Sequence, residues 1–261
     1  MMIKVEKIMS MLQTEYVGRE IHYFQKVTST NAIAKEEAKK NAKAGTVIIA
    51  DTQTRGHGRL NRKWISPKGG VWLSIILKPT IAAEETPIIT LATSTAVANT
   101  IHRLHTLKTE VKWPNDVLVN GRKICGILTE SSIEGENIKF IIVGVGINAN
   151  FNLDVLPTDL RSTTTSLKQL LRENVDLERL ICVFLKEFEE HYELFKKRRF
   201  DALRDEWRGM AGFLGKNVEV MSFRETFMGK ALDIDENGAL IVELENGERR
   251  RLLSGDLTVR E

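Results

Sequence analysis

The segment from residue 111 to residue 148 constrains the fold most, because its pattern admits little except neighbouring β-strands. Asn120-Gly121 lies between the runs VLV and KIC, and Asn-Gly in such a place is typical of a two-residue hairpin turn. A second turn at 134–137 precedes the apolar run at 138–147. The middle of the chain is therefore predicted to be a set of strands joined by short turns.

Strands and helices alternate before this segment. The expected elements are a short amphipathic helix within 3–16, a strand at 20–27, a helix from 28–31 to about Lys43, strands at 46–50 and 71–77, and a helix at 87–104. Ser, Thr and Asn at 29–31 indicate a helix start, because their side chains can satisfy free N–H groups. Residues 51–63 have no apolar period and predict a loop.

Two further regions follow the strand-rich segment at 111–148. Residues 165–206 are predicted to be mostly helical, with one break near Asn174, and the composition changes at 209–215. Short alternating strands are expected after that at 218–220, 226–234, 239–245 and 248–253. Short strands separated by Gly turns are typical of a small β-barrel. We therefore predict two domains, at 1–211 and 212–261.

Composition excludes several classes of protein. The 261 residues are 42% hydrophobic and 28% charged, which is typical of a globular chain. A net charge of +3 suits anionic substrates but does not indicate a nucleic-acid-binding face. The cysteines Cys125 and Cys182 fit no metal-ligand spacing, so we expect core thiols and no protein metal site. Without a membrane-length apolar run or a signal-peptide pattern, we expect a cytoplasmic protein with no membrane contact.

The loop at 53–64 concentrates positive charge among glycines. Its four cations are Arg55, Arg59, Arg62 and Lys63, and Gly56 and Gly58 lie close to them. Gly lets backbone N–H groups approach an anion, and Arg offers a planar fork for carboxylate or phosphate oxygens. We expect a loop that is mobile when empty and ordered by an anionic ligand. The alternative is a solvated loop, since charged loops are common.

Two further segments carry polar groups among buried strands. Residues 112–116 (KWPND) end one strand, where Asn115 and Asp116 add hydrogen-bonding groups, and Lys123 opens the next. A lysine in a buried strand loses hydration unless it meets an anion, although a strand-end lysine can also reach water. The apolar strand at 143–148 contains Gly144 and Gly146, which indicate a close neighbour or ligand. That strand lacks the third glycine and the helix of a dinucleotide fingerprint.

In order and spacing, four motifs resemble the catalytic module of biotin–protein ligases. They are STN at Ser29, GHGRLNRKW at Gly56, KWPNDVLVNGRKICGIL at Lys112 and GVGINAN at Gly144. The tail from about residue 212 to residue 260 resembles the family's small SH3-like C-terminal domain. The resemblance implies an α+β fold, with a mixed sheet and flanking helices related to class II aminoacyl-tRNA synthetases, followed by the small β-barrel.

The resemblance also implies an activity and a site. The substrates would be biotin and ATP, with Mg²⁺ carried on the ATP phosphates, and biotinyl-5′-AMP would pass its biotin to a lysine of a biotin carboxyl carrier protein. The catalytic residues would be Arg59, Lys123 and Lys112. The biotin-binding residues would be Ser29, Thr30, Asn31, Gln53, His57, Gly58, Arg59, Lys123 and Gly126. The nucleotide-binding residues would be Arg55, Arg59, Arg62, Trp64, Asn115 and Asn148.

Some features depart from the family pattern. His57 stands where the family usually has Arg or Lys, which weakens one cation at neutral pH because the usual pKa of histidine is near 6.5. Asn61 stands where Gly is usual and can still adopt a positive φ. Only 28 residues precede Ser29, so we expect a short form without an N-terminal DNA-binding domain and without a repressor role. The oligomeric state, including a homodimer, stays open.

Two rival functions remain. A lipoate–protein ligase or octanoyltransferase shares the fold, but an octanoyltransferase needs a nucleophilic cysteine, and Cys125 lies in an apolar strand. A nucleic-acid-binding protein would use the basic runs at 196–199 and 249–251 around the barrel, although short basic runs are usually solvated.

Overall fold

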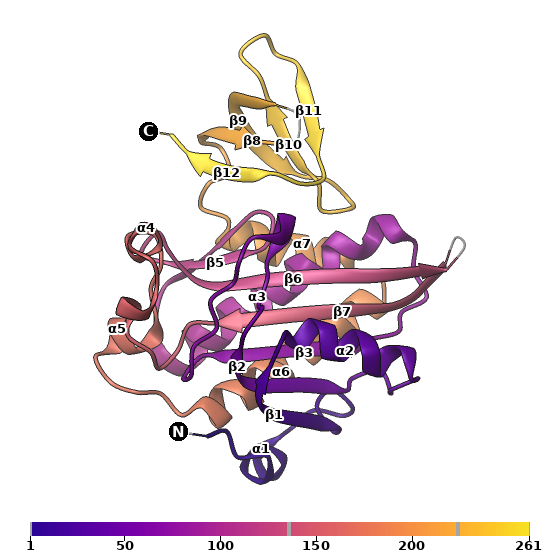
Figure 1. Ribbon diagram of the computed structural model, residues 1–261. Coiled ribbons are helices and arrows are strands. Elements are labelled where there is room, and N and C mark those ends of the chain that lie inside the picture. The colour runs from indigo at the N-terminus through magenta and orange to yellow at the C-terminus, as the bar shows by residue number, and fades with distance from the viewer. Residues whose placement is uncertain (1, 135–136, 223–224, 261) are drawn as a thin grey trace.

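The protein is described here by a computed structural model, which covers residues 2–134, 137–222 and 225–260 (Figure 1). Residues 135 and 136 of the expected turn at 134–137 lie outside the described part. A mixed seven-stranded sheet has the order β1-β2-β3-β7-β6-β5-β4, in which β1 and β2 run parallel and the other neighbours antiparallel. Its strands are β1 (Ile21–Val27), β2 (Val47–Gln53), β3 (Val71–Leu77), β4 (Thr109–Lys112), β5 (Asp116–Val119), β6 (Arg122–Glu134) and β7 (Asn137–Ile147).

Helices cover both faces of this sheet, which explains why all seven residues of β3 are buried. The helices are α1 (Val5–Met11), α2 (Thr30–Lys39), α3 (Thr86–His105), α4 (Thr158–Arg161), α5 (Leu167–Leu171), α6 (Leu177–Lys196) and α7 (Phe200–Met210), and short 3₁₀ turns lie at η1 (Arg59–Asn61), η2 (Ala83–Glu85) and η3 (Leu153–Val155). Helices α3 and α6 pack in the large core, whereas α2 packs Ala34 and Ala38 against Ile48 and Ile142 on the other face. In the described residues, no helix is both long and apolar enough to cross a membrane.

The structure corrects several expected boundaries. Helix α2 ends at Lys39 rather than near Lys43, because Asn41 adopts a φ of 68° that cannot continue a helix. The helical region has a second break, where Arg198 has a φ of 56° between α6 and α7. Within the expected loop, β2 extends to Gln53 and η1 forms one short turn. Asn61 has a φ of 56°, as its side chain permits.

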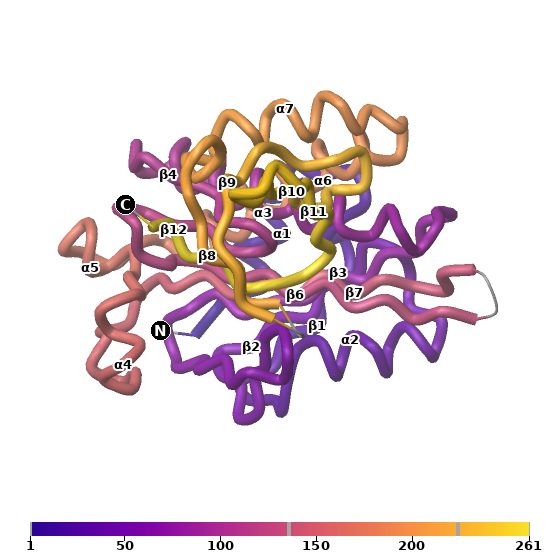
Figure 2. Tube along the Cα trace, turned by 90° about the horizontal axis from the view of Figure 1, so that it is seen from above, coloured from indigo at the N-terminus to yellow at the C-terminus, as the bar shows by residue number. Residues whose placement is uncertain are grey.

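The C-terminal part is a five-stranded antiparallel sheet with the order β11-β10-β9-β8-β12. Its strands are β8 (Asn217–Met221), β9 (Thr226–Ile234), β10 (Leu240–Glu243), β11 (Arg249–Leu252) and β12 (Asp256–Val259). The last strand was not expected, and it pairs with β8. Seen from above, this sheet lies over the middle of the molecule with α7 along one side (Figure 2).

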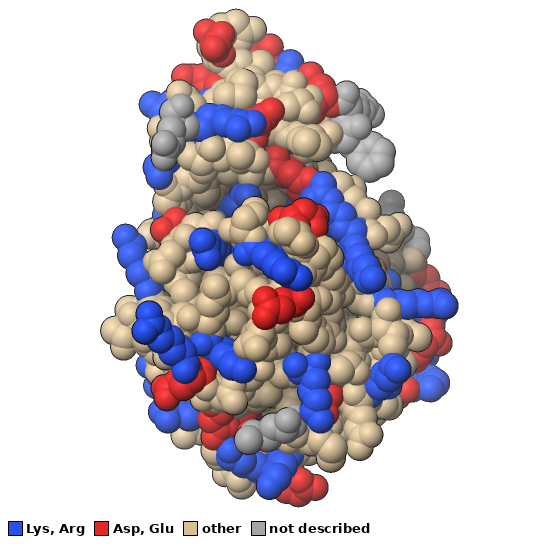
Figure 3. All heavy atoms as spheres, turned by 60° about the vertical axis from the view of Figure 1, so that its left-hand side comes forward, with Lys and Arg blue, Asp and Glu red and all other residues tan. Residues whose placement is uncertain are grey.

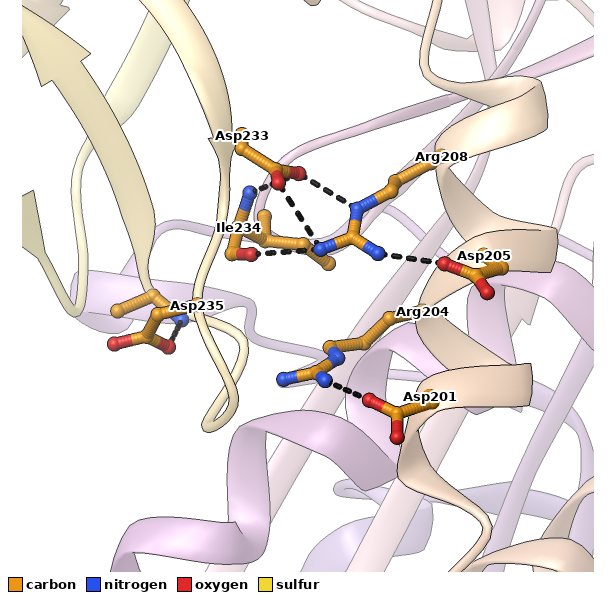
Figure 4. Close-up of polar contacts among 8 residues, drawn as sticks. Asp201, Arg204, Asp205, Arg208, Asp233, Ile234 and Asp235 are labelled. Carbon is orange, nitrogen blue, oxygen red and sulfur yellow. Dashed lines mark hydrogen bonds and ion pairs between the residues drawn. The ribbon is translucent and has the colours of Figure 1, made fainter.

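An arginine on α7 fastens the C-terminal sheet to the rest of the molecule (Figure 4). Arg208 donates from Nε and Nη2 to the two carboxylate oxygens of Asp233, at 2.6 and 3.0 Å, and from Nη2 to the Ile234 carbonyl at 3.2 Å. A guanidinium that donates to both oxygens of one carboxylate fixes the orientation of the two groups as well as the distance between them. The division of the chain between residues 211 and 212 stays a prediction.

Candidate active site

A cavity of about 280 Å³ lies against strands β6 and β7 and brings together most of the residues expected at the site. The predicted site residues that line it are Ser29, Thr30, Asn31, Gln53, His57, Gly58, Arg59, Arg62, Trp64, Asn115, Lys123 and Gly126. Lys63, Leu73, Asp116 and Asp256 also line it. Uncharged hydrogen-bonding groups gather at one end, which we call the amide end. Cations gather at the other end, which we call the cationic end.

The amide end begins at the first turn of α2. Ser29 occupies the N-cap position, but its side chain does not cap the helix. The cap comes instead from β2, because Gln53 Oε1 accepts hydrogen bonds from the Thr30 backbone N–H at 2.8 Å and from the Thr30 hydroxyl at 3.1 Å. Gln53 Nε2 in turn donates to Ser66 Oγ at 2.7 Å. Capping from a neighbouring strand leaves Ser29 to line the cavity.

Asn31 is held by partners that the sequence reasoning missed. Its Nδ2 donates to Glu130 Oε2 at 2.7 Å and to the Leu128 carbonyl at 3.3 Å, and its Oδ1 accepts from the hydroxyl of Ser74 at 2.6 Å. Ser74 is fully buried within β3. These contacts fix which way the Asn31 amide points. The sequence did contain a signal for Ser74, which is the lone polar residue in the apolar run VWLSIIL.

Glu130 links the amide end to the charged loop. It accepts a hydrogen bond from Lys35 Nζ at 2.5 Å, and one of its oxygens lies 3.8 Å from His57 Nε2. Burial raises the pKa of Glu130, but the bonds from Lys35 and Asn31 outweigh burial and leave the pKa below its usual value. Glu130 therefore stays an anion at neutral pH, next to His57 of the loop.

The glycines of β6 and β7 make room for protein side chains rather than serving as a nucleotide fingerprint. A Cβ added at Gly144 would lie 2.2 Å from Asn31 Oδ1, and one added at Gly146 would lie 2.5 Å from Trp64 Nε1. At Gly126 an added Cβ would meet the Trp64 ring at 3.0 Å and Lys123 Cε at 3.1 Å. The glycines thus set the depth at which Asn31 and Trp64 lie on the sheet.

Lys123 and Asp116 form the centre of the cationic end. Lys123 Nζ lies 2.6 Å from Asp116 Oδ1 and 5.1 Å from the centroid of the Trp64 ring. The lysine backbone also bonds the segment after β7, with N–H donated to the Thr163 carbonyl and the carbonyl accepting from Thr165 N–H. The buried-strand lysine therefore meets an anion, as its position predicted, and that anion belongs to the protein.

The arginines of the loop reach the C-terminal sheet. Arg59 Nη1 donates to the Gly255 carbonyl at 3.1 Å and to Asn115 Oδ1 at 3.3 Å. Burial lowers the pKa of Arg59, while the nearby carboxylates of Asp256 and Asp116 raise it. Arg62 forms an ion pair with Asp256. Asp256, the first residue of β12, thus supplies part of the wall at the cationic end.

Three of the predicted site residues do not line the cavity. Lys112 pairs with Asp116 across the β4–β5 hairpin. Asn148 is buried and donates from Nδ2 to the Thr165 carbonyl at 3.0 Å, so it ties the end of β7 to the following segment. Arg55 is exposed, and its backbone N–H bonds the Thr28 carbonyl. Their assigned roles stay predictions that the geometry does not support.

The two cysteines are unsuited to nucleophilic catalysis. Cys125 is fully buried within β6, and burial raises its pKa far above the usual value of a thiol. Cys182 is also buried, and burial raises its pKa to about 11. A thiol must ionise to attack a substrate, so neither serves as an acyl carrier at neutral pH. In the described residues, no group of three or more His, Cys, Asp or Glu side chains is placed to hold a metal ion.

Comparisons with known proteins agree with this architecture. Residues 3–148 match the model of the biotin/lipoate A/B protein ligase family, and residues 213–260 match the biotin protein ligase C terminal domain. The bifunctional ligase/repressor BirA of Bacillus spizizenii is 38% identical over 247 residues, covering 94% of this chain and 76% of the relative. The biotin–[acetyl-CoA-carboxylase] ligase of Paracoccus denitrificans is 28% identical, covering 82% of this chain and 90% of the relative.

A solved structure is similar over nearly the whole chain. The biotin protein ligase from Aquifex aeolicus in complex with biotin and ATP superposes with a TM-score of 0.79 at 27% sequence identity. The match covers 93% of this chain and 99% of that structure. The fold similarity therefore includes both the seven-stranded sheet and the C-terminal sheet.

Proposed function

The chain belongs to the biotin/lipoate A/B protein ligase family and is a biotin–protein ligase, and on this premise we propose how its cavity carries the reaction. In the proposed reaction, biotin and ATP form biotinyl-5′-AMP and pyrophosphate. The adenylate then passes biotin to a lysine of the carrier domain of a biotin-dependent carboxylase. The observation that carries the proposal is the division of one cavity into an amide end and a cationic end.

The amide end suits the uncharged ureido head of biotin. Ser29, Thr30 and Asn31 line this end together, and Gln53 closes its edge. A ureido group offers one carbonyl acceptor and two N–H donors, which hydroxyl and amide side chains can match. The carboxyl tail of biotin would then extend along β6 toward Lys123.

The cationic end suits a carboxylate that meets a triphosphate. A biotin carboxylate oxygen attacks the α-phosphorus, the bond to the β-phosphate breaks, and pyrophosphate leaves with the bonding electrons. Arg59 and Lys123 are placed to offset the negative charge that builds up, once substrate oxygens replace Asp116 and the Gly255 carbonyl as their partners. Mg²⁺ would arrive on the ATP phosphates, with Asp116 and Asp256 as the carboxylates that line this end.

The second step needs no nucleophile from the enzyme. The neutral amine of the acceptor lysine attacks the acyl carbon, a C–N bond forms, and the bond from acyl carbon to phosphate oxygen breaks to release AMP. The proton lost by the amine passes to water. The loop from Thr54 to Lys63 would shield the adenylate from hydrolysis until then.

The structure gives the nucleic-acid alternative little support. Arg249, Arg250 and Arg251 pair with Glu243, Glu225 and Asp235, respectively. Asp and Glu side chains are also interspersed among the Lys and Arg side chains on the face shown in Figure 3. Our expectation that this chain has no repressor role stays a prediction, although the Bacillus spizizenii relative is named a bifunctional ligase/repressor. Sequence-specific DNA binding in a gel-shift measurement would contradict it.

Pyrophosphate release by the purified protein tests the proposed function. With ATP, Mg²⁺ and biotin, we expect release that depends on biotin and that lipoate and octanoate do not replace. Addition of an unbiotinylated carrier domain of an acetyl-CoA carboxylase should then give a biotinylated carrier, detected by mass spectrometry. Equal release with octanoate would favour the lipoate–octanoate branch of the family.

A further inference from the structure

A second cavity, of about 180 Å³, lies next to the cationic end of the first one. The two cavities share Arg59, Asn115, Ile127 and Leu128 as lining residues. Arg59 and Asn115 belong to the cationic end, where the carboxylate of biotin would meet the α-phosphate. A group held against Arg59 and Asn115 in the second cavity would therefore lie next to residues that, in the proposed reaction, meet the biotin carboxylate.

The walls of the second cavity are mostly apolar. Leu91 from α3, the Trp113 ring and Leu253 from the C-terminal sheet contribute to them. Trp113 Nε1 is already engaged, because it donates to the Gly238 carbonyl at 3.1 Å. Leu253 is 61% exposed and lies where the cavity faces solvent. Both domains thus enclose this space.

Few polar groups remain available in it. Thr90 donates its hydroxyl hydrogen to Thr129 Oγ1 at 2.8 Å. The hydroxyl oxygen of Thr86 is buried and has no hydrogen-bond partner within the described residues, although its residue lines the cavity. This oxygen has essentially no accessible surface, so it is not a polar group that a bound ligand can reach.

The lining of the second cavity fits the acceptor lysine better than it fits pyrophosphate. Pyrophosphate carries several negative charges, whereas Arg59 is the one cation among the residues described at this cavity. A lysine side chain instead has a four-carbon apolar stem that apolar walls favour. Its amine must be neutral to attack, and a guanidinium next to the amine lowers the pKa of the amine.

We propose that the second cavity admits the lysine of the acceptor protein, with its stem against Leu91, Trp113 and Leu253 and its amine directed toward the shared wall at Arg59 and Asn115. This assignment rests on the proposed function. It makes the C-terminal sheet part of the acceptor site, since Leu253 forms one side of the entrance.

A Leu253→Trp variant tests the assignment by obstructing the entrance. Leu253 is exposed, so the larger ring has room without disturbing the core. Met228→Trp is the matched control, because Met228 is 45% exposed on the same sheet and does not line either cavity. Three rates are compared: pyrophosphate release, trapping of the adenylate by hydroxylamine, and transfer to an unbiotinylated carrier domain of an acetyl-CoA carboxylase.

We expect Leu253→Trp to lower kcat/KM for the carrier by about tenfold or more, with the other two rates within about twofold of wild type. Hydroxylamine is small enough to reach the adenylate without this entrance. Met228→Trp should leave all three rates near wild type.

Two results would overturn the assignment. Unchanged carrier transfer in Leu253→Trp would show that the acceptor enters elsewhere. An equal fall in all three rates would place the second cavity in the adenylation site. A wild-type protein that releases no pyrophosphate with biotin would contradict the proposed function itself, before any variant is compared.

Discussion

The two ends of the cavity hold their polar groups in different ways. At the amide end, Thr30 and Asn31 are fixed by neighbours on β2, β3 and β6 through short hydrogen bonds. At the cationic end, Lys123 and Arg62 are held by Asp116 and Asp256, and Arg59 by a carbonyl oxygen. In the proposed reaction the first set of partners would stay when substrates bind, whereas the second set would give way to substrate oxygens.

The physical reason lies in the charge of the expected ligands. An uncharged head group can be met by hydroxyls and amides that are already oriented, at little desolvation cost. A half-buried cation such as Lys123 needs an anion nearby even when no substrate is bound. Asp116 provides that anion, and in the proposed reaction phosphate oxygens would replace it. A site for a neutral group can therefore be rigid in advance, and a site for an anion is built from exchangeable contacts.

Removing a cation should have the largest effect. Arg59→Ala and Lys123→Ala are each expected to slow biotin-dependent pyrophosphate release by one to two decades, since a charge-assisted contact contributes about 1.5–3 kcal/mol. Lys68→Ala is the control, because Lys68 is exposed and outside the cavity. Circular dichroism checks that each variant folds. Release near wild type in both variants would contradict the assignment of the cationic end.

Filling the floor of the amide end should have the next largest effect. Ala at Gly144 would place a Cβ 2.2 Å from Asn31 Oδ1, so the amide must shift. We expect the KM for biotin to rise by about tenfold while the KM for ATP stays nearly constant, because misplacement by about an ångström weakens such contacts strongly. Gly209→Ala on α7 is the control, since nothing lies within 4 Å of its added Cβ. Equal changes in both KM values would contradict the separation of the two ends.

Releasing the loop from the C-terminal sheet should have the smallest effect. Asp256→Asn removes the ion pair with Arg62, in which Arg62 is 60% exposed, and an exposed pair contributes only about 0–1 kcal/mol. Amide exchange at residues 54–63 without ligand should therefore accelerate by no more than about fivefold. Biotinyl-AMP should slow this exchange in both wild type and variant. Asp201→Asn, which removes the pair with Arg204 on α7, is the matched control.

Much of the fold followed from local sequence. The Asn120-Gly121 turn is confirmed, with φ values of 51° and 71° at its two residues, because few residues other than Asn and Gly tolerate that geometry. The apolar run VWLSIIL is a strand buried on both faces, as its unbroken hydrophobicity predicted. The motifs also indicated the family correctly, and Gly58, Arg59, Arg62 and Lys63 of the predicted loop line the cavity.

The partners of the site residues depended on tertiary structure alone. Gln53 caps Thr30 from 23 positions away, and Arg62 meets Asp256 across 194 positions. Lys112 belongs to the KWPND motif yet lies outside the cavity, although Asp116, its partner across the β4–β5 hairpin, lines it. Periodicity sets which residues of a strand share a face, but the order of strands and the docking of the C-terminal sheet decide which faces meet. The sequence therefore determined the elements and the kind of chemistry, and only the packing of β2, β3, β6 and β7 under the C-terminal sheet decided which side chains hold one another there.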